Sequence, residues 1–176
     1  MTTDFVHVAT LLGKLAGFRG PMTPVDEEER LHSELLSGDP VEASRALLHV
    51  LGTWAPVPGV DIADVEAVAA GLLSDLAVVP AVVGRLIDAL GQHSTRAVAL
   101  DALGLSGERR ASGPLAEVVL SRGYRGWTER EMVKLASALG MIAGPEALSA
   151  IETLAERGPW PELIKREIQI ARGGGA

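Results

Sequence analysis

The sequence predicts an all-α protein, in which about ten short helices stack as antiparallel helical hairpins to form an α-solenoid. Apolar residues recur at three- and four-residue steps along nearly the whole chain, which is the spacing of amphipathic helices. Gly, Pro, Ser, Thr or Asp separate the apolar runs, as tight turns between short helices require. With only two Phe, three Trp and one Tyr, the core must consist mainly of Leu, Ala and Val. Leu and Ala favour helix.

The first three helices are predicted within residues 1–60. The first extends from about Asp4 to Phe18. Thr23 is the expected N-cap of the second helix and Pro24 its first helical residue, because a proline has no N–H group to leave unpaired there. Asp39-Pro40 repeats this start signal for a third helix. Residues 1–60 are therefore expected to form a helical N-terminal part.

Similar signals place the helices that follow. Asp61 is suited to cap a fourth helix, a fifth extends from about Val78 to Leu90, and Ser94 opens a sixth. Gly113-Pro114 falls inside a later helix, where a proline predicts either a kink or a later helix start. Residues 159–172 are expected to form a C-terminal capping helix.

Two segments of the chain repeat each other. Leu103-Gly104 recurs as Leu139-Gly140, a displacement of 36 residues (139 − 103). The apolar positions that follow recur at the same displacement: Ala111, Leu115 and Val118 become Ala147, Ile151 and Leu154. A helical hairpin with its two turns needs roughly 30 to 45 residues, so this period predicts stacked hairpins that bury their apolar faces on one another.

The repeated pattern resembles that of HEAT repeats, and most closely the bacterial HEAT-like subgroup known from phycobilisome lyases. The residues that carry the resemblance are Leu103, Gly104, Gly107, Ala111, Leu115 and Val118, and again Leu139, Gly140, Gly144, Ala147, Ile151 and Leu154. It implies HEAT-like repeats over residues 61–158, within a single domain of residues 1–176. Because glycine and alanine mark places where helices turn and cross closely, the resemblance concerns the fold more than an activity.

Motifs and composition favour a protein without catalytic chemistry. The chain contains no cysteine, and it carries no GxSxG elbow, P-loop or GxGxxG pattern. Its histidines stand singly, without a second ligand at the spacing that places two on one helix face: His7, His32, His49 and His93. We therefore expect a protein that is not an enzyme and has neither a cofactor nor a metal.

The sequence also predicts where the protein resides. The most apolar stretch, residues 76–84, is interrupted by Pro80 and is far shorter than the roughly 20 residues of a membrane-spanning helix. The N-terminus lacks the basic region of a signal peptide. We expect a cytoplasmic protein that does not enter a membrane. The net charge of −7 argues against nucleic acid as a partner, because phosphate binding requires a basic surface.

The segment 121–130 differs from this acidic, aromatic-poor background. Residues 106–130 carry five basic and three acidic residues, a net charge of +2 (5 − 3). Arg, Tyr and Trp are the residue types most often found as binding hot spots. The predicted partner-binding residues are Arg122, Tyr124, Arg125, Trp127 and Arg130, with Arg109 and Arg110 as an extension of the patch. In an alternative interpretation, Trp127 fills the gap between repeats as the hydrophobic residue before an N-cap at Thr128.

The leading functional hypothesis is a non-catalytic protein–protein interaction module, acting on another protein as adaptor, assembly factor or accessory subunit. Stacked hairpins form a long curved face that suits another polypeptide, and HEAT-like proteins usually act as scaffolds. The resemblance leaves open a HEAT-like enzyme of the lyase or glycosylase type, although a glycosylase would be expected to carry a strongly basic concave face. Weak, salt-dependent nucleic-acid binding through residues 106–130 is a further alternative.

Overall fold

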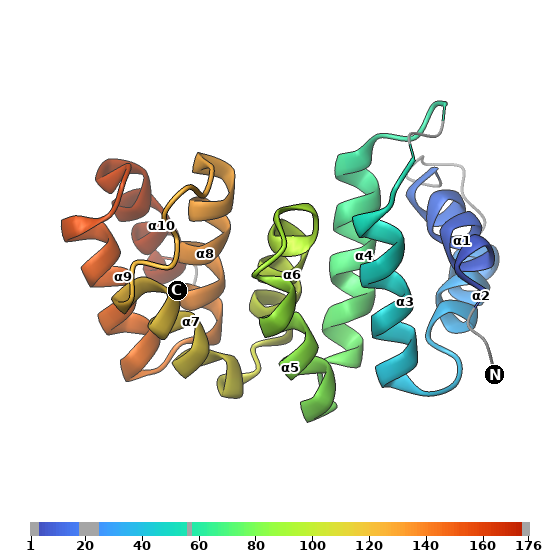
Figure 1. Cartoon of the computed structure of the whole chain (residues 1–176), viewed down its shortest axis with the longest axis horizontal. Coiled ribbons are helices and arrows are strands. Elements are labelled where there is room, and N and C mark those ends of the chain that lie inside the picture. Colours follow the sequence, from blue (N-terminus) through green and yellow to red (C-terminus); the bar gives the residue numbers. More distant parts are fainter. Residues whose placement is uncertain (1–3, 18–24, 56–57, 174–176) are drawn as a thin grey trace.

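The computed structural model describes residues 4–17, 25–55 and 58–173. In these ranges it contains ten α-helices, one 3₁₀ turn and no β-strand (Figure 1), which confirms the predicted all-α class. No helix of the described part is long and apolar enough to cross a membrane. The elements are α1 (Phe5–Gly17), α2 (Val25–Leu35), α3 (Pro40–Gly52), α4 (Ile62–Leu76), α5 (Pro80–Ala89), α6 (His93–Ser106), η1 (Arg109–Ala111), α7 (Ser112–Leu120), α8 (Glu129–Ile142), α9 (Pro145–Arg157) and α10 (Pro161–Gly173).

Capping side chains start α3 and α4 where the sequence predicts them. Asp39 accepts a hydrogen bond from the N–H group of Val41 at 2.7 Å. Asp61 accepts one from the N–H group of Ala63 at 2.9 Å. Each bond satisfies a donor that has no partner within the first turn of its helix. The start signal predicted for the second helix, Thr23-Pro24, lies outside the described residues.

Two prolines move helix starts. The helix predicted from about Val78 begins at Pro80, because proline fits the first helical position, where its missing N–H costs nothing. In the second case, η1 makes one turn before α7 begins at Ser112. Pro114 then lies in the first turn of α7, which resolves the predicted choice between a kink and a later start in favour of the later start.

The helices from α3 onwards alternate in direction and lie in two rows (Figure 1). One row consists of α4, α6, α8 and α10, each packed against the next. The other consists of α3, α5, α7 and α9, with η1 linking α5 to α7. One cluster of buried apolar side chains extends between the rows, from Leu11 in α1 to Ile164 in α10.

Helices α6 and α8 of the first row approach each other closely at Gly104. A Cβ atom added to Gly104 would lie 3.0 Å from the Cα atom of Ala138, closer than real Cβ atoms normally come. Gly104 is therefore required by the spacing of the two helices, as the repeated Leu-Gly pattern suggests. Leu103 and its counterpart Leu139 are both fully buried. Two leucines that the sequence pattern pairs therefore both lie in the core.

The alternation of helix direction sorts the loops into two edges. The loops that follow α3, α5, α7 and α9 lie along one edge, the upper edge in Figure 1. The loops that follow α4, α6 and α8 lie along the opposite edge. We call the first the loop edge; its described residues are 53–55, 58–61, 90–92, 121–128 and 158–160.

Candidate functional site

The loop edge collects most of the aromatic side chains. All three tryptophans and the single tyrosine of the chain lie in its loops: Trp54, Tyr124, Trp127 and Trp160. Trp160, between α9 and α10, has 40% of its surface exposed, and Ile62, the residue that follows the loop 58–61 at the start of α4, has 46%. Trp54 and Tyr124 are half-buried. Apolar and aromatic surface is therefore available on this edge.

The segment 121–128 is held by its own backbone hydrogen bonds. At the end of α7, the N–H of Gly123 donates to the carbonyl oxygen of Val118 at 2.8 Å, and the N–H of Arg122 donates to that of Val119 at 3.1 Å. This pair of bonds is a Schellman motif, with Arg122 in the left-handed region at φ 56°. The N–H of Arg125 then donates to the carbonyl oxygen of Arg122 at 3.2 Å and closes a second turn.

The two aromatic rings of this segment pack into the protein. Trp127 retains only 9% of its surface exposed and belongs to the apolar core. Tyr124 is half-buried and packs against the same core. The burial of Trp127 matches the alternative interpretation, a hydrophobic plug before the N-cap at Thr128, and does not match an exposed hot spot. The rings therefore anchor the segment.

The predicted arginines of this segment have different surroundings. Arg122 and Arg125 are exposed, and no acidic side chain of the described residues forms an ion pair with either. Arg130 is also exposed, but it pairs with Glu66 of α4 across the start of α6. Of the three, only Arg122 and Arg125 keep their charge available to a partner.

Arg109 and Arg110 do not extend the patch, contrary to the sequence-based expectation. They lie in η1, before the start of α7, whereas Arg122 and Arg125 follow its end. The nine residues of α7 separate the two groups by roughly 13 Å along the helix, because an α-helix rises about 1.5 Å per residue. The two pairs thus lie on opposite edges of the molecule (Figure 1).

Arg96 of α6 lies beneath the segment 121–128, and its role was not predicted from the sequence. Its Nε donates to the carbonyl oxygen of Leu90 at 2.7 Å, and its Nη1 donates to Oε1 of Glu131 at 2.9 Å. The guanidinium also lies over the ring of Trp127, 4.6 Å from the ring centre. Arg96 therefore ties the start of α8 to the start of α6.

Glu131 is the acidic member of this network. Its Oε2 accepts hydrogen bonds from the backbone N–H of Thr128 at 2.6 Å and from the Thr128 hydroxyl at 2.8 Å, completing a capping box. The Nδ1 of His93 lies 3.1 Å from Oε1. Both carboxylate oxygens are thus engaged in structural contacts. The spacing Thr-x-x-Glu at 128–131 is the sequence signal from which this capping box could have been predicted.

The surroundings of Glu131 change its acidity. Burial of the carboxylate favours the neutral form, but the hydrogen bonds from Thr128 and the positive charge of Arg96 favour the ionised form more strongly. The pKa of Glu131 is therefore lower than its ordinary value. The network holds a permanently charged carboxylate at neutral pH.

This lowered pKa predicts an acid-dependent loss of stability. Between the ordinary value of 4.5 and the lower folded pKa of Glu131, the unfolded chain binds a proton that the folded chain does not. The stability that the ionised Glu131 contributes is fully present at pH values above this range, and it is lost as the pH falls towards the folded pKa. We expect thermal unfolding, followed by circular dichroism, to show a steeper loss of Tm below about pH 4.5 for the wild type than for Glu131→Gln. Parallel curves for the two proteins would contradict this assignment.

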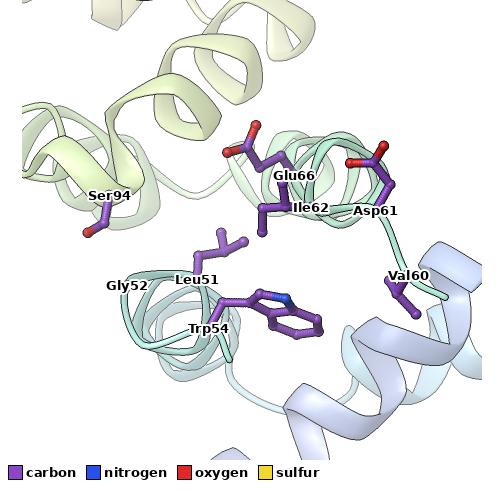
Figure 2. Close-up of a pocket in the computed structure, with 8 residues that line it drawn as sticks. All are labelled: Leu51, Gly52, Trp54, Val60, Asp61, Ile62, Glu66 and Ser94. Carbon is purple, nitrogen blue, oxygen red and sulfur yellow. The ribbon is translucent and has the colours of Figure 1, made fainter. Parts of the chain in front are cut away.

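A pocket of about 560 Å³ opens on the loop edge between α3, α4 and α6 (Figure 2). Its apolar walls are Leu51, Trp54, Val60 and Ile62, and its polar groups come from Asp61, Glu66 and Ser94. One oxygen of Asp61 caps α4, and Glu66 is paired with Arg130. The pocket is thus an apolar hollow whose carboxylates already have structural partners, a form that suits a side chain of another molecule.

No group of three or more His, Cys, Asp or Glu side chains in the described part of the chain is arranged to hold a metal ion.

A comparison of the sequence with models of known protein families found no match, and a search of curated proteins found no significant match either.

Proposed function

We propose that this protein is a non-catalytic protein-interaction module, which acts as adaptor, assembly factor or accessory subunit and binds its partner through the loop edge. The observation that carries the proposal is the concentration of Trp, Tyr and unpaired Arg on this one edge. These residue types are enriched in the parts of interfaces that contribute most binding energy. Trp54, Tyr124 and Trp160 keep part of their surface accessible there.

The proposal includes an α-solenoid of the HEAT-like type as the scaffold. Two rows of alternating helices support it, as does the burial of equivalent repeat positions, such as Ala111 and Ala147, which are both fully buried. In such a stack each hairpin contacts mainly its neighbours, so the turns of successive hairpins line up at one edge. The loop edge is that line of turns.

The pocket between α3, α4 and α6 supports the same edge as the binding surface. Ile62 and Trp54 contribute to its apolar wall and remain partly exposed to solvent. Removing such apolar surface from water contributes roughly 25 cal/mol per Å², which offsets part of the entropy that association costs. A side chain of the partner that fills this hollow would therefore act as an anchor.

Affinity purification from the native host would test the proposed function. The bait would be the tagged wild type, the double variant Ile62→Ser/Trp160→Ala, and the control Leu105→Ala. Leu105 is also apolar and 58% exposed, but it lies at the end of α6, towards the opposite edge. We expect a co-purifying protein that the wild type and the control retain and the double variant loses. Retention by all three baits, or no stoichiometric partner for any, would refute the proposal.

A further inference from the structure

We infer that Arg122 and Arg125 form an anion-binding pair that receives neighbouring carboxylates from a short acidic segment of the partner protein. The inference rests on the proposed function, because it assigns a chemical class to part of the partner. The observation behind the inference is that one hydrogen-bonded turn holds two exposed guanidinium groups without ion-pair partners among the described residues.

The turn places the two arginines close together. The hydrogen bond from the N–H of Arg125 to the carbonyl oxygen of Arg122 closes a four-residue turn, so their Cα atoms lie within about 7 Å of each other. The buried ring of Trp127 and the half-buried ring of Tyr124 anchor this turn. Because the backbone of this turn is already hydrogen-bonded, binding would cost little additional backbone entropy.

The charges of the surrounding residues leave this pair unneutralised. The neighbouring arginines are engaged: Arg96 pairs with Glu131, and Arg130 pairs with Glu66. Arg122 and Arg125 have no such partner among the described residues, in a chain whose net charge is −7. Two adjacent guanidinium groups can bind carboxylates with paired hydrogen bonds.

The backbone conformation of Arg122 also supports a role in binding. It occupies the C′ position of the Schellman motif, which requires a left-handed backbone and is most often filled by glycine. An L-residue with a Cβ atom is strained there, and the side chain of Arg122 forms no ion pair in the described structure that offsets the strain. A strained position that holds an exposed, unpaired charge is typical of a residue used in binding.

The chemistry of the site favours a polypeptide over a nucleic acid. A phosphate backbone needs a long basic surface, whereas here the exposed Glu129 lies four residues after Arg125. Single-stranded nucleic acids also need well-exposed aromatic rings for base stacking, whereas in this segment Trp127 is buried and Tyr124 is half-buried. A stretch of two or three adjacent carboxylates matches the size and charge of the pair.

A titration followed by NMR would test the inference with two peptides, Gly-Glu-Asp-Glu-Glu-Gly and its neutral counterpart Gly-Gln-Asn-Gln-Gln-Gly. We expect the acidic peptide alone to shift the amide resonances of residues 121–126 in a saturable manner. Arg122→Gly should weaken this binding at least about tenfold, the loss typical of a charge-assisted hydrogen bond, while raising Tm by roughly 1–4 °C through relief of the strain. The control Arg109→Ala removes an exposed arginine from the opposite edge and should change neither property.

Three results would overturn the inference: equal binding of the neutral peptide, an equal loss in Arg109→Ala, or a lower Tm for Arg122→Gly. Tighter binding of a single-stranded DNA oligonucleotide at the same resonances would also overturn it and would identify a nucleic-acid site instead. If the acidic peptide fails but the loop edge still captures a protein by affinity purification, this inference fails and the proposed function stands. If the affinity purification fails while the peptide binds, Arg122 and Arg125 form an anion-binding pair, but the proposed function fails and with it the assignment of a partner protein.

Discussion

Replacing Trp127 with alanine is expected to lower the free energy of unfolding by about 3–5 kcal/mol, the usual cost of removing a buried aromatic side chain. Trp127 is 9% exposed and packs in the core, so the substitution would leave a cavity beneath the segment 121–128. It would also remove the ring over which the guanidinium of Arg96 lies at 4.6 Å. Urea unfolding followed by circular dichroism would measure the change as a lower midpoint.

Trp127→Phe is the matched control, because it keeps an aromatic face under Arg96 and most of the buried apolar surface. We expect this variant to lose much less stability than Trp127→Ala. The two interpretations of the sequence predict opposite results here. An exposed hot spot would leave the stability of Trp127→Ala unchanged and affect only partner binding. Stability equal to the wild type would therefore contradict the buried position.

Replacing Glu131 with alanine is expected to lower the free energy of unfolding by about 3 kcal/mol or more. The Glu131 side chain is 4% exposed and that of Arg96 is 12% exposed. Removing the carboxylate would leave the guanidinium of Arg96 largely buried without its counterion, and it would also remove the capping box at the start of α8. Equilibrium unfolding in urea would again provide the measurement.

Glu129→Ala controls for the loss of an acidic residue near the start of the same helix, because Glu129 is exposed and a change there should alter stability by no more than about 0.5 kcal/mol. A double-mutant cycle with Arg96→Met would isolate the ion pair. We expect Arg96→Met to lower the free energy of unfolding much less in the Glu131→Ala variant than in the wild type. The difference, which is the coupling energy of the two side chains, should be about 1–3 kcal/mol. Additive losses would show that the two side chains stabilise the protein independently.

The residues changed in these two experiments also connect the core to the proposed binding surface. Trp127, Arg96 and Glu131 form one contiguous set of contacts between α6, α8 and the segment that precedes α8. The turn that carries Arg122 and Arg125 belongs to this segment. The network is therefore expected to position the arginine pair, although none of its three members needs to touch a partner.

The helices themselves could be predicted from the sequence because their causes are local. An apolar residue every three or four positions determines which face of a helix is buried. The capping side chains Asp39 and Asp61 and the first-position proline Pro80 act within one turn of the residues they affect. Gly104 could be predicted as a close crossing because its pattern recurs later in the chain.

The candidate site depended on contacts between residues far apart in the sequence. Sequence proximity grouped Arg109 and Arg110 with Arg122 and Arg125, but the length of α7 places the two pairs on opposite edges. Trp127 has the composition of a hot spot, and only its packing against the core and Arg96 decides that it is an anchor. The sequence alone thus determined which segments form helices, because hydrogen bonds and caps act over a few residues. Which side chains remain exposed was decided by tertiary packing, because burial depends on neighbours that the spacing of residues does not reveal.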